Sequence, residues 1–70
     1  MKTVRFHREL YPGPVLDEAL KVYESFATVD RSEEPAYWVV TLTANGEARE
    51  RRIAGELGNY ALGLAVRKRS

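Results

Sequence analysis

The sequence predicts an α+β fold in the order strand, helix, strand, strand, helix, with two helices packed on one face of a small, mainly antiparallel sheet. Two segments alternate polar and apolar residues, as half-buried strands do. Two longer segments repeat apolar residues at spacings of three and four, which is typical of a helix with one buried face. We expect a single domain over residues 1–70.

The first part of the chain predicts a strand and a helix. Thr3–Arg8 alternates like a strand, and the turn Pro12–Pro14 places a proline at the start of a helix over Val15–Phe26. Asp17 and Glu18 are expected in the first turn, where the helix dipole favours negative charge. The apolar stripe of this helix consists of Val15, Leu16, Ala19, Leu20, Val22, Tyr23 and Phe26.

The middle of the chain predicts two strands joined by a polar turn. Ala27–Asp30 is a short strand, Arg31–Pro35 is the turn, and Ala36–Ala44 is the clearest strand because it is rich in aromatic and β-branched residues. Its inner face holds Trp38, Val40 and Leu42, and its outer face holds Tyr37, Val39, Thr41 and Thr43. The outer face mixes polar and apolar residues, which leaves room for a partner to cover it.

The last helix is the segment around which the rest of the chain is organised. We expect it to begin within Glu47–Arg52, because these residues are good helix formers; a returning strand is the alternative. One face carries Ile53, Leu57, Tyr60 and Leu64, and a neighbouring small stripe carries Ala54, Gly58, Ala61 and Ala65. Glycine costs a helix about 1 kcal/mol relative to alanine. The glycines of this helix therefore predict close packing of another group against the helix backbone.

Composition excludes several classes of protein. Eleven basic and ten acidic residues give a net charge of +1, so we expect neither nucleic acid nor a membrane as partner. The absence of cysteine excludes disulfides and thiolate metal sites. No apolar run approaches the roughly 20 residues of a membrane span, and residues 1–10 lack a signal-peptide core, so the expected compartment is the cytoplasm. The basic clusters Arg49–Arg52 and Arg67–Arg69 are interpreted as solvated helix faces with glutamates as counter-charges, and contact with RNA is the alternative.

Residues with catalytic potential are sparse. A single histidine, His7, excludes a multi-histidine metal site, and no carboxylates are spaced for acid–base catalysis. We therefore expect no enzyme activity, no cofactor and no metal. Trp38 is interpreted as a core residue, with stacking on a nucleic-acid base as the alternative.

What remains is a protein-interaction surface. Asn59 interrupts an apolar helical run at a cost in propensity, which predicts a specific hydrogen bond to the neighbouring strand or to a partner. The predicted contact residues combine the small stripe, its polar neighbours and the outer strand face: Ala54, Gly55, Glu56, Gly58, Asn59, Ala61, Ala65, Tyr37 and Val39.

A family resemblance follows from Tyr11–Pro12, Ala19, Tyr23, the strand Tyr37–Leu42, and the segment with Gly55, Glu56, Leu57, Asn59 and Leu62. These segments, in this order, resemble the HxsD-like proteins of His-Xaa-Ser peptide systems. The resemblance implies a small, non-catalytic accessory protein that acts with radical SAM enzymes in the maturation of a ribosomally made peptide. A radical SAM enzyme is then the expected protein partner.

Two alternatives stay open. In element order and in its small-residue last helix, the chain is also similar to the small dimerising subunit of the KEOPS tRNA-modification complex. A self-associating domain, a homodimer with no client, is the third interpretation.

Overall fold

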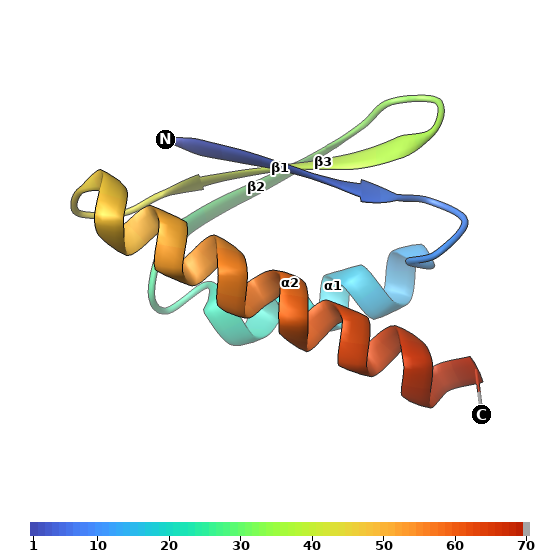
Figure 1. The fold of residues 1–70 in the computed structure, drawn as a ribbon. Coiled ribbons are helices and arrows are strands. Elements are labelled where there is room, and N and C mark those ends of the chain that lie inside the picture. The colour runs from blue at the N-terminus through green and yellow to red at the C-terminus, as the bar shows by residue number, and fades with distance from the viewer. Residues whose placement is uncertain (70) are drawn as a thin grey trace.

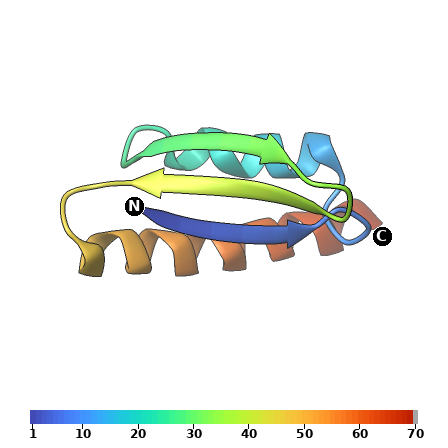
Figure 2. The ribbon, with the colours of Figure 1, turned by 90° about the horizontal axis from the view of Figure 1, so that it is seen from above.

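The computed structural model describes residues 1–69, apart from the side chain of Arg69, and they form a two-layer α+β structure (Figure 1). The elements in order are β1 (Lys2–His7), α1 (Gly13–Tyr23), β2 (Thr28–Glu33), β3 (Tyr37–Thr43) and α2 (Glu47–Arg69). Both helices cover the same face of the sheet, and no element within residues 1–69 lies over its other face (Figure 2). The predicted fold class and element order are confirmed.

The sheet has the order β1-β3-β2, and both outer strands run antiparallel to β3. The two outer strands are therefore parallel to each other, with α1 as the crossover between them, which is a split β-α-β unit. The register aligns Phe6 with Trp38 and Val29 with Leu42. Apolar side chains from all three strands consequently face the helices.

The core lies between this sheet face and the two helices. Its largest fully buried side chains are Leu16 of α1, Val40 and Leu42 of β3, and Leu57 of α2. Burying each such side chain contributes about 1.5–3 kcal/mol. The predicted inner face of β3 and the predicted bulky face of α2 are confirmed by this packing.

α1 is shorter at its end than the sequence predicts. The helix ends at Tyr23, and the N–H groups of Phe26 and Ala27 donate hydrogen bonds to the Tyr23 carbonyl as the chain turns away. The predicted apolar stripe is therefore too long, since Val22 is 42% exposed and Phe26 is 53% exposed.

α1 also begins earlier, at Gly13, with a proline in its first turn as predicted. Asp17 and Glu18 consequently lie beyond the first turn, and the prediction that they complement the helix dipole there is wrong. Asp17 instead forms an ion pair with Arg31 of β2, with 2.8 Å between Asp17 Oδ1 and Arg31 Nη1. This contact ties α1 to the edge of the sheet.

β2 continues through Arg31–Glu33, where the sequence predicts a turn. The turn lies after Glu33, and the N–H of Glu34 donates a 2.8 Å hydrogen bond to the Tyr37 carbonyl. The polar composition of this strand is tolerated because it is an edge strand whose inward-facing arginine finds partners on α1 and β3.

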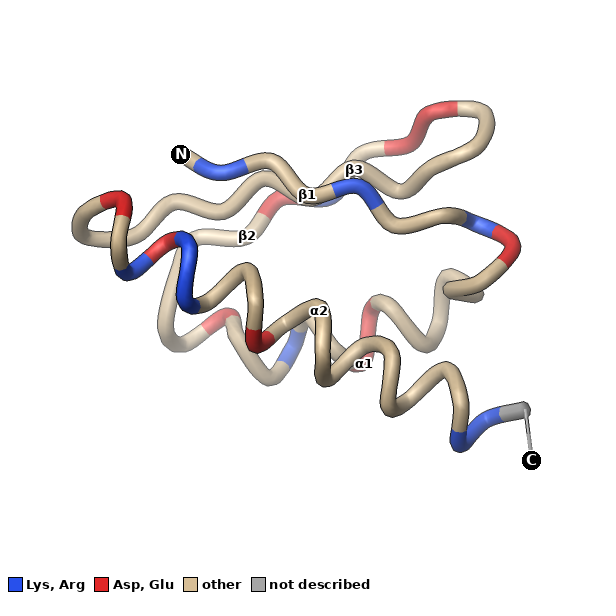
Figure 3. The backbone as a smooth tube through the Cα atoms, viewed as in Figure 1, with Lys and Arg blue, Asp and Glu red and all other residues tan. Residues whose placement is uncertain are grey.

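α2 begins at Glu47, directly after the Asn45-Gly46 turn, so the early helix start is confirmed. Gly46 has a φ of 93°, a left-handed conformation that favours glycine. Charges gather in the first turns of α2 and near its end (Figure 3). Of the predicted C-terminal cations, Arg67 and Lys68 are exposed, and the side chain of Arg69 lies outside the described part of the chain.

Glu50 joins the start of α2 to the beginning of β1 and the end of β3, which lie at the same end of the sheet. Its carboxylate accepts hydrogen bonds from the Met1 ammonium at 2.8 Å and from the Ala44 N–H at 3.0 Å. These two donors hold the pKa of Glu50 below its usual value, against the opposing effect of its burial. The first strand and the start of the last helix are thereby fastened together.

Candidate functional site

The first candidate surface is the open sheet face, the side of the sheet opposite the helices (Figure 2). Successive residues of a strand point to opposite faces, so the residues between the core positions form this surface. It consists of Thr3, Arg5, His7, Thr28, Asp30, Ser32, Tyr37, Val39, Thr41 and Thr43, all exposed or half-buried. The predicted outer face of β3 is therefore on the outside of the molecule.

Tyr37 and Val39 supply the large apolar area of the open sheet face. The Tyr37 ring makes an edge-to-face contact with His7, with 5.3 Å between ring centroids. Arg5, which lies opposite Val39 in the register, forms an ion pair with Glu34 at 3.3 Å. The sheet face thus carries an apolar area in the first half of β3, bordered by hydroxyl groups and charges.

The alanines of the predicted small stripe are not part of the molecular surface. Ala54, Ala61 and Ala65 are 8%, 0% and 2% exposed, and all three belong to the hydrophobic core. α2 packs both on the sheet and on α1, so the two neighbouring stripes of the helix are both covered. The prediction that these three alanines present an outward contact face is wrong.

The glycines of α2, in contrast, face open space within the described part of the chain. A β-carbon built at Gly55, Gly58 or Gly63 meets no atom within 4 Å outside the local helix backbone. The predicted close packing at these glycines is therefore not found among the described residues. Gly58 is half-buried, and the other two glycines are exposed.

The polar neighbours of the small stripe are on the surface. Gly55, Glu56 and Asn59 are all exposed. Asn59 is exposed, and no hydrogen bond from its side chain to a strand is found among the described residues. A bond from Asn59 to a partner stays a prediction.

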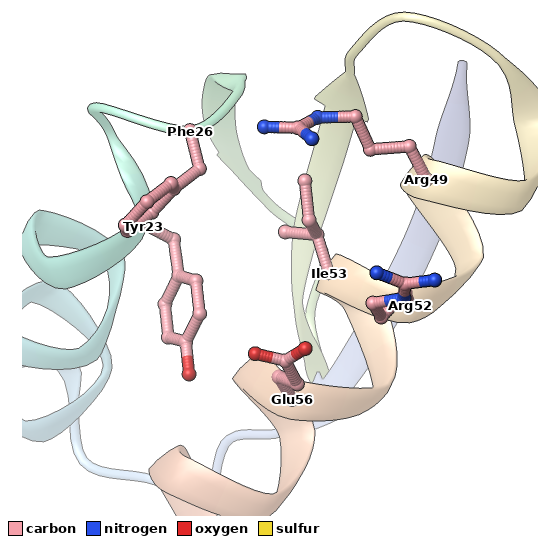
Figure 4. A pocket seen from close by; sticks show the side chains of 6 residues that line it. All are labelled: Tyr23, Phe26, Arg49, Arg52, Ile53 and Glu56. Atoms are coloured by element: carbon pink, nitrogen blue, oxygen red, sulfur yellow. The ribbon is translucent and has the colours of Figure 1, made fainter.

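The second candidate surface is the arginine pocket, which the sequence does not predict. It lies where α1 ends beside the first half of α2, and its volume is about 250 Å³. Tyr23 and Phe26 line it from one side, and Arg49, Arg52, Ile53 and Glu56 line it from α2 (Figure 4). The α2 residues are spaced at three and four positions and so share one helix face.

The pocket has an apolar floor and charged rims. Ile53 is 6% exposed at its base, while Phe26 is 53% exposed at its edge. In Figure 4 the guanidinium of Arg49 extends toward Phe26, and the carboxylate of Glu56 extends toward the Tyr23 hydroxyl. Burial raises the pKa of Tyr23, and the negative charge of Glu56 raises it further.

The two arginines of the pocket are without an ion-pair partner in the described part of the chain. The ion pairs found there are Met1–Glu50, Arg5–Glu34 and Arg31–Asp17. Glu50, one of the predicted counter-charges, is bound to the chain's N-terminal ammonium instead. The guanidinium groups are consequently available to an anion.

Comparison with known proteins provides no identity. No protein-family model, no curated protein and no solved structure matches this chain. Within residues 1–69, no helix combines the length and apolar character needed to cross a membrane. The same residues contain no group of three or more metal-ligating side chains placed to hold an ion.

Trp38 is a core residue, as the sequence predicts. Its ring is 8% exposed, and Nε1–H donates a 2.7 Å hydrogen bond to the Tyr11 carbonyl. The guanidinium groups of Arg8 and Arg31 lie 4.3 and 4.8 Å from the ring centroid. The ring is therefore occupied by contacts within the chain and does not present a free face for stacking on a base.

Proposed function

We propose that this chain is a non-catalytic protein-interaction module of the cytoplasm, and that the open sheet face contacts its partner. The sequence resemblance to HxsD-like proteins supports a radical SAM enzyme of peptide maturation as that partner. The proposal assigns binding, and no catalytic step, to this chain.

The observation that carries the proposal is the contrast between the two faces of one strand. Trp38 on the inner side of β3 is buried under the helices, while Tyr37 on the outer side is exposed and Val39 is half-buried. Tyrosine and other aromatic residues are enriched in protein interfaces relative to the rest of the surface.

The size of the surface indicates the kind of contact. Strands of six or seven residues in three rows cover about 20 by 14 Å, roughly 280 Å². A standard interface buries about 800 Å² per partner. A partner must therefore also reach the strand edges or the loops, or the contact is transient.

Affinity capture with a surface variant tests the proposal. Val39→Glu places a carboxylate on the open sheet face. Arg5 lies directly opposite and can exchange its exposed ion pair with Glu34 for this carboxylate, so we expect the fold to be retained. Tagged wild-type and variant proteins are compared in lysate of the source organism, with mass spectrometry as the readout. We expect a radical SAM enzyme with the wild type and at least tenfold less with the variant.

Ser25→Glu is the matched control, because it adds the same charge at an exposed position after α1. Circular dichroism establishes that both variants are folded. Equal capture by wild type and Val39→Glu would remove the open sheet face from the interface. Capture that is lost on nuclease treatment would favour the RNA-modification alternative, and a dimer that Val39→Glu dissociates would favour self-association.

A further inference from the structure

We propose that the arginine pocket binds the C-terminal residue of a peptide or protein when that residue has an apolar side chain. This inference goes beyond the proposed function and does not depend on the open sheet face. It uses a different surface, formed by the end of α1 and the first half of α2.

The charges of the pocket select an anion. Arg49 extends its guanidinium toward Phe26, and Arg52 places a second guanidinium beyond Ile53 (Figure 4). Neither arginine is neutralised by an ion pair within the described residues. Guanidinium groups bind carboxylates through paired, charge-assisted hydrogen bonds. Glu56 at the other end repels a second negative group and offers an acceptor for a backbone N–H.

The apolar lining of the pocket favours a ligand that has an apolar group as well as a negative charge. Ile53 forms the floor and the Tyr23 and Phe26 rings, whose centroids are 6.3 Å apart, form the wall. A side chain packed there removes the exposed Phe26 ring from water. An inorganic anion gains nothing from this lining.

The volume of the pocket indicates that the carboxylate and the apolar group of the ligand belong to one residue. About 250 Å³ lies below the 300–1,000 Å³ typical of pockets for drug-sized ligands, so the space suits a single residue. Within one residue, a carboxylate and an apolar side chain occur together at a chain's C-terminus. Small free ligands are usually enclosed over most of their surface. The exposed rim at Phe26 instead leaves an exit for the preceding peptide chain.

Fluorescence anisotropy with a labelled peptide tests this assignment. The probe is Gly-Ser-Gly-Phe with fluorescein at its N-terminus, as the free acid and as the C-terminal amide. We expect the folded, full-length protein to bind the acid at least tenfold more tightly than the amide. Arg49→Gln and Arg52→Gln should each reduce the affinity for the acid at least fivefold and leave the affinity for the amide unchanged.

Arg51→Gln is the matched control, because it removes the same charge from an exposed position between the two arginines that does not line the pocket. Equal binding of acid and amide, or an equal loss in Arg51→Gln, would overturn the proposal. Displacement of the probe by free phenylalanine at the same concentration as by unlabelled peptide would also overturn it. Val39→Glu is expected to bind the probe like wild type, so failure here and failure of the proposed function are distinguishable.

Discussion

Replacing Gly58 by alanine is expected to stabilise the protein. Gly58 lies in the interior of α2, where alanine is about 1 kcal/mol more favourable than glycine. The added β-carbon meets no atom within 4 Å outside the local helix backbone, so no steric penalty opposes this gain. In a domain of 70 residues, 1 kcal/mol corresponds to a rise in Tm of about 4–8 °C.

Urea unfolding and thermal melting, both followed by far-ultraviolet circular dichroism, measure this effect. Gly55→Ala and Gly63→Ala have the same open space and should give similar increases. Gly46→Ala is the opposite control. Its φ of 93° is unfavourable for any residue with a β-carbon, so it should lower the free energy of unfolding by about 1–2 kcal/mol.

A loss of stability in Gly58→Ala would refute the reasoning. It would mean that another group does pack closely against the helix at this position in solution, as the sequence alone predicts. The loss would then depend on protein concentration, because the described part of one chain leaves the space empty. Melting at several concentrations separates the two cases.

Three further predictions concern the buried Leu57 and Trp38 and the Glu50 carboxylate that binds the Met1 ammonium. Leu57→Ala removes a fully buried side chain and should cost about 2–5 kcal/mol in urea unfolding. Trp38→Phe leaves the Tyr11 carbonyl without its 2.7 Å donor and should cost about 1–3 kcal/mol, while Tyr37→Phe should cost less than about 0.5 kcal/mol. The pKa of Glu50 is lower in the folded state than its ordinary value of 4.5, so ionised Glu50 stabilises the folded state above pH 4.5. This stabilisation is lost as the pH falls through the folded-state pKa of Glu50. The difference in Tm between wild type and Glu50→Gln should therefore narrow from pH 7 to about pH 3, and a constant difference would contradict this linkage.

Local periodicity was sufficient to predict the element types. The strand over Tyr37–Thr43 alternates because one face meets the core, and α2 repeats at helical spacing for the same reason. The Asn45-Gly46 turn was predictable because a left-handed residue is required there. These signals depend on residues close together in the chain.

The length of β2 was not predictable in this way. Arg31 faces inward, and its place is stabilised by Asp17 and by the Trp38 ring, which are distant in sequence. A local pattern shows only a run of polar residues. The same limitation applies to the small stripe. A helical wheel shows which residues share a helix face, but it does not show that α1 and the sheet cover two neighbouring faces of α2.

The arginine pocket follows from unequal helix lengths. α1 has 11 residues and α2 has 23, so they span about 16 and 34 Å. The helices run in opposite directions, and the first turns of α2 extend past the end of α1 (Figure 1). The α2 face from Arg49 to Glu56 is therefore covered only at one side, by Tyr23 and Phe26. One more turn of α1 would extend it along this face, so the early end of α1 at Tyr23 leaves both the aromatic wall and the two arginines open to a ligand.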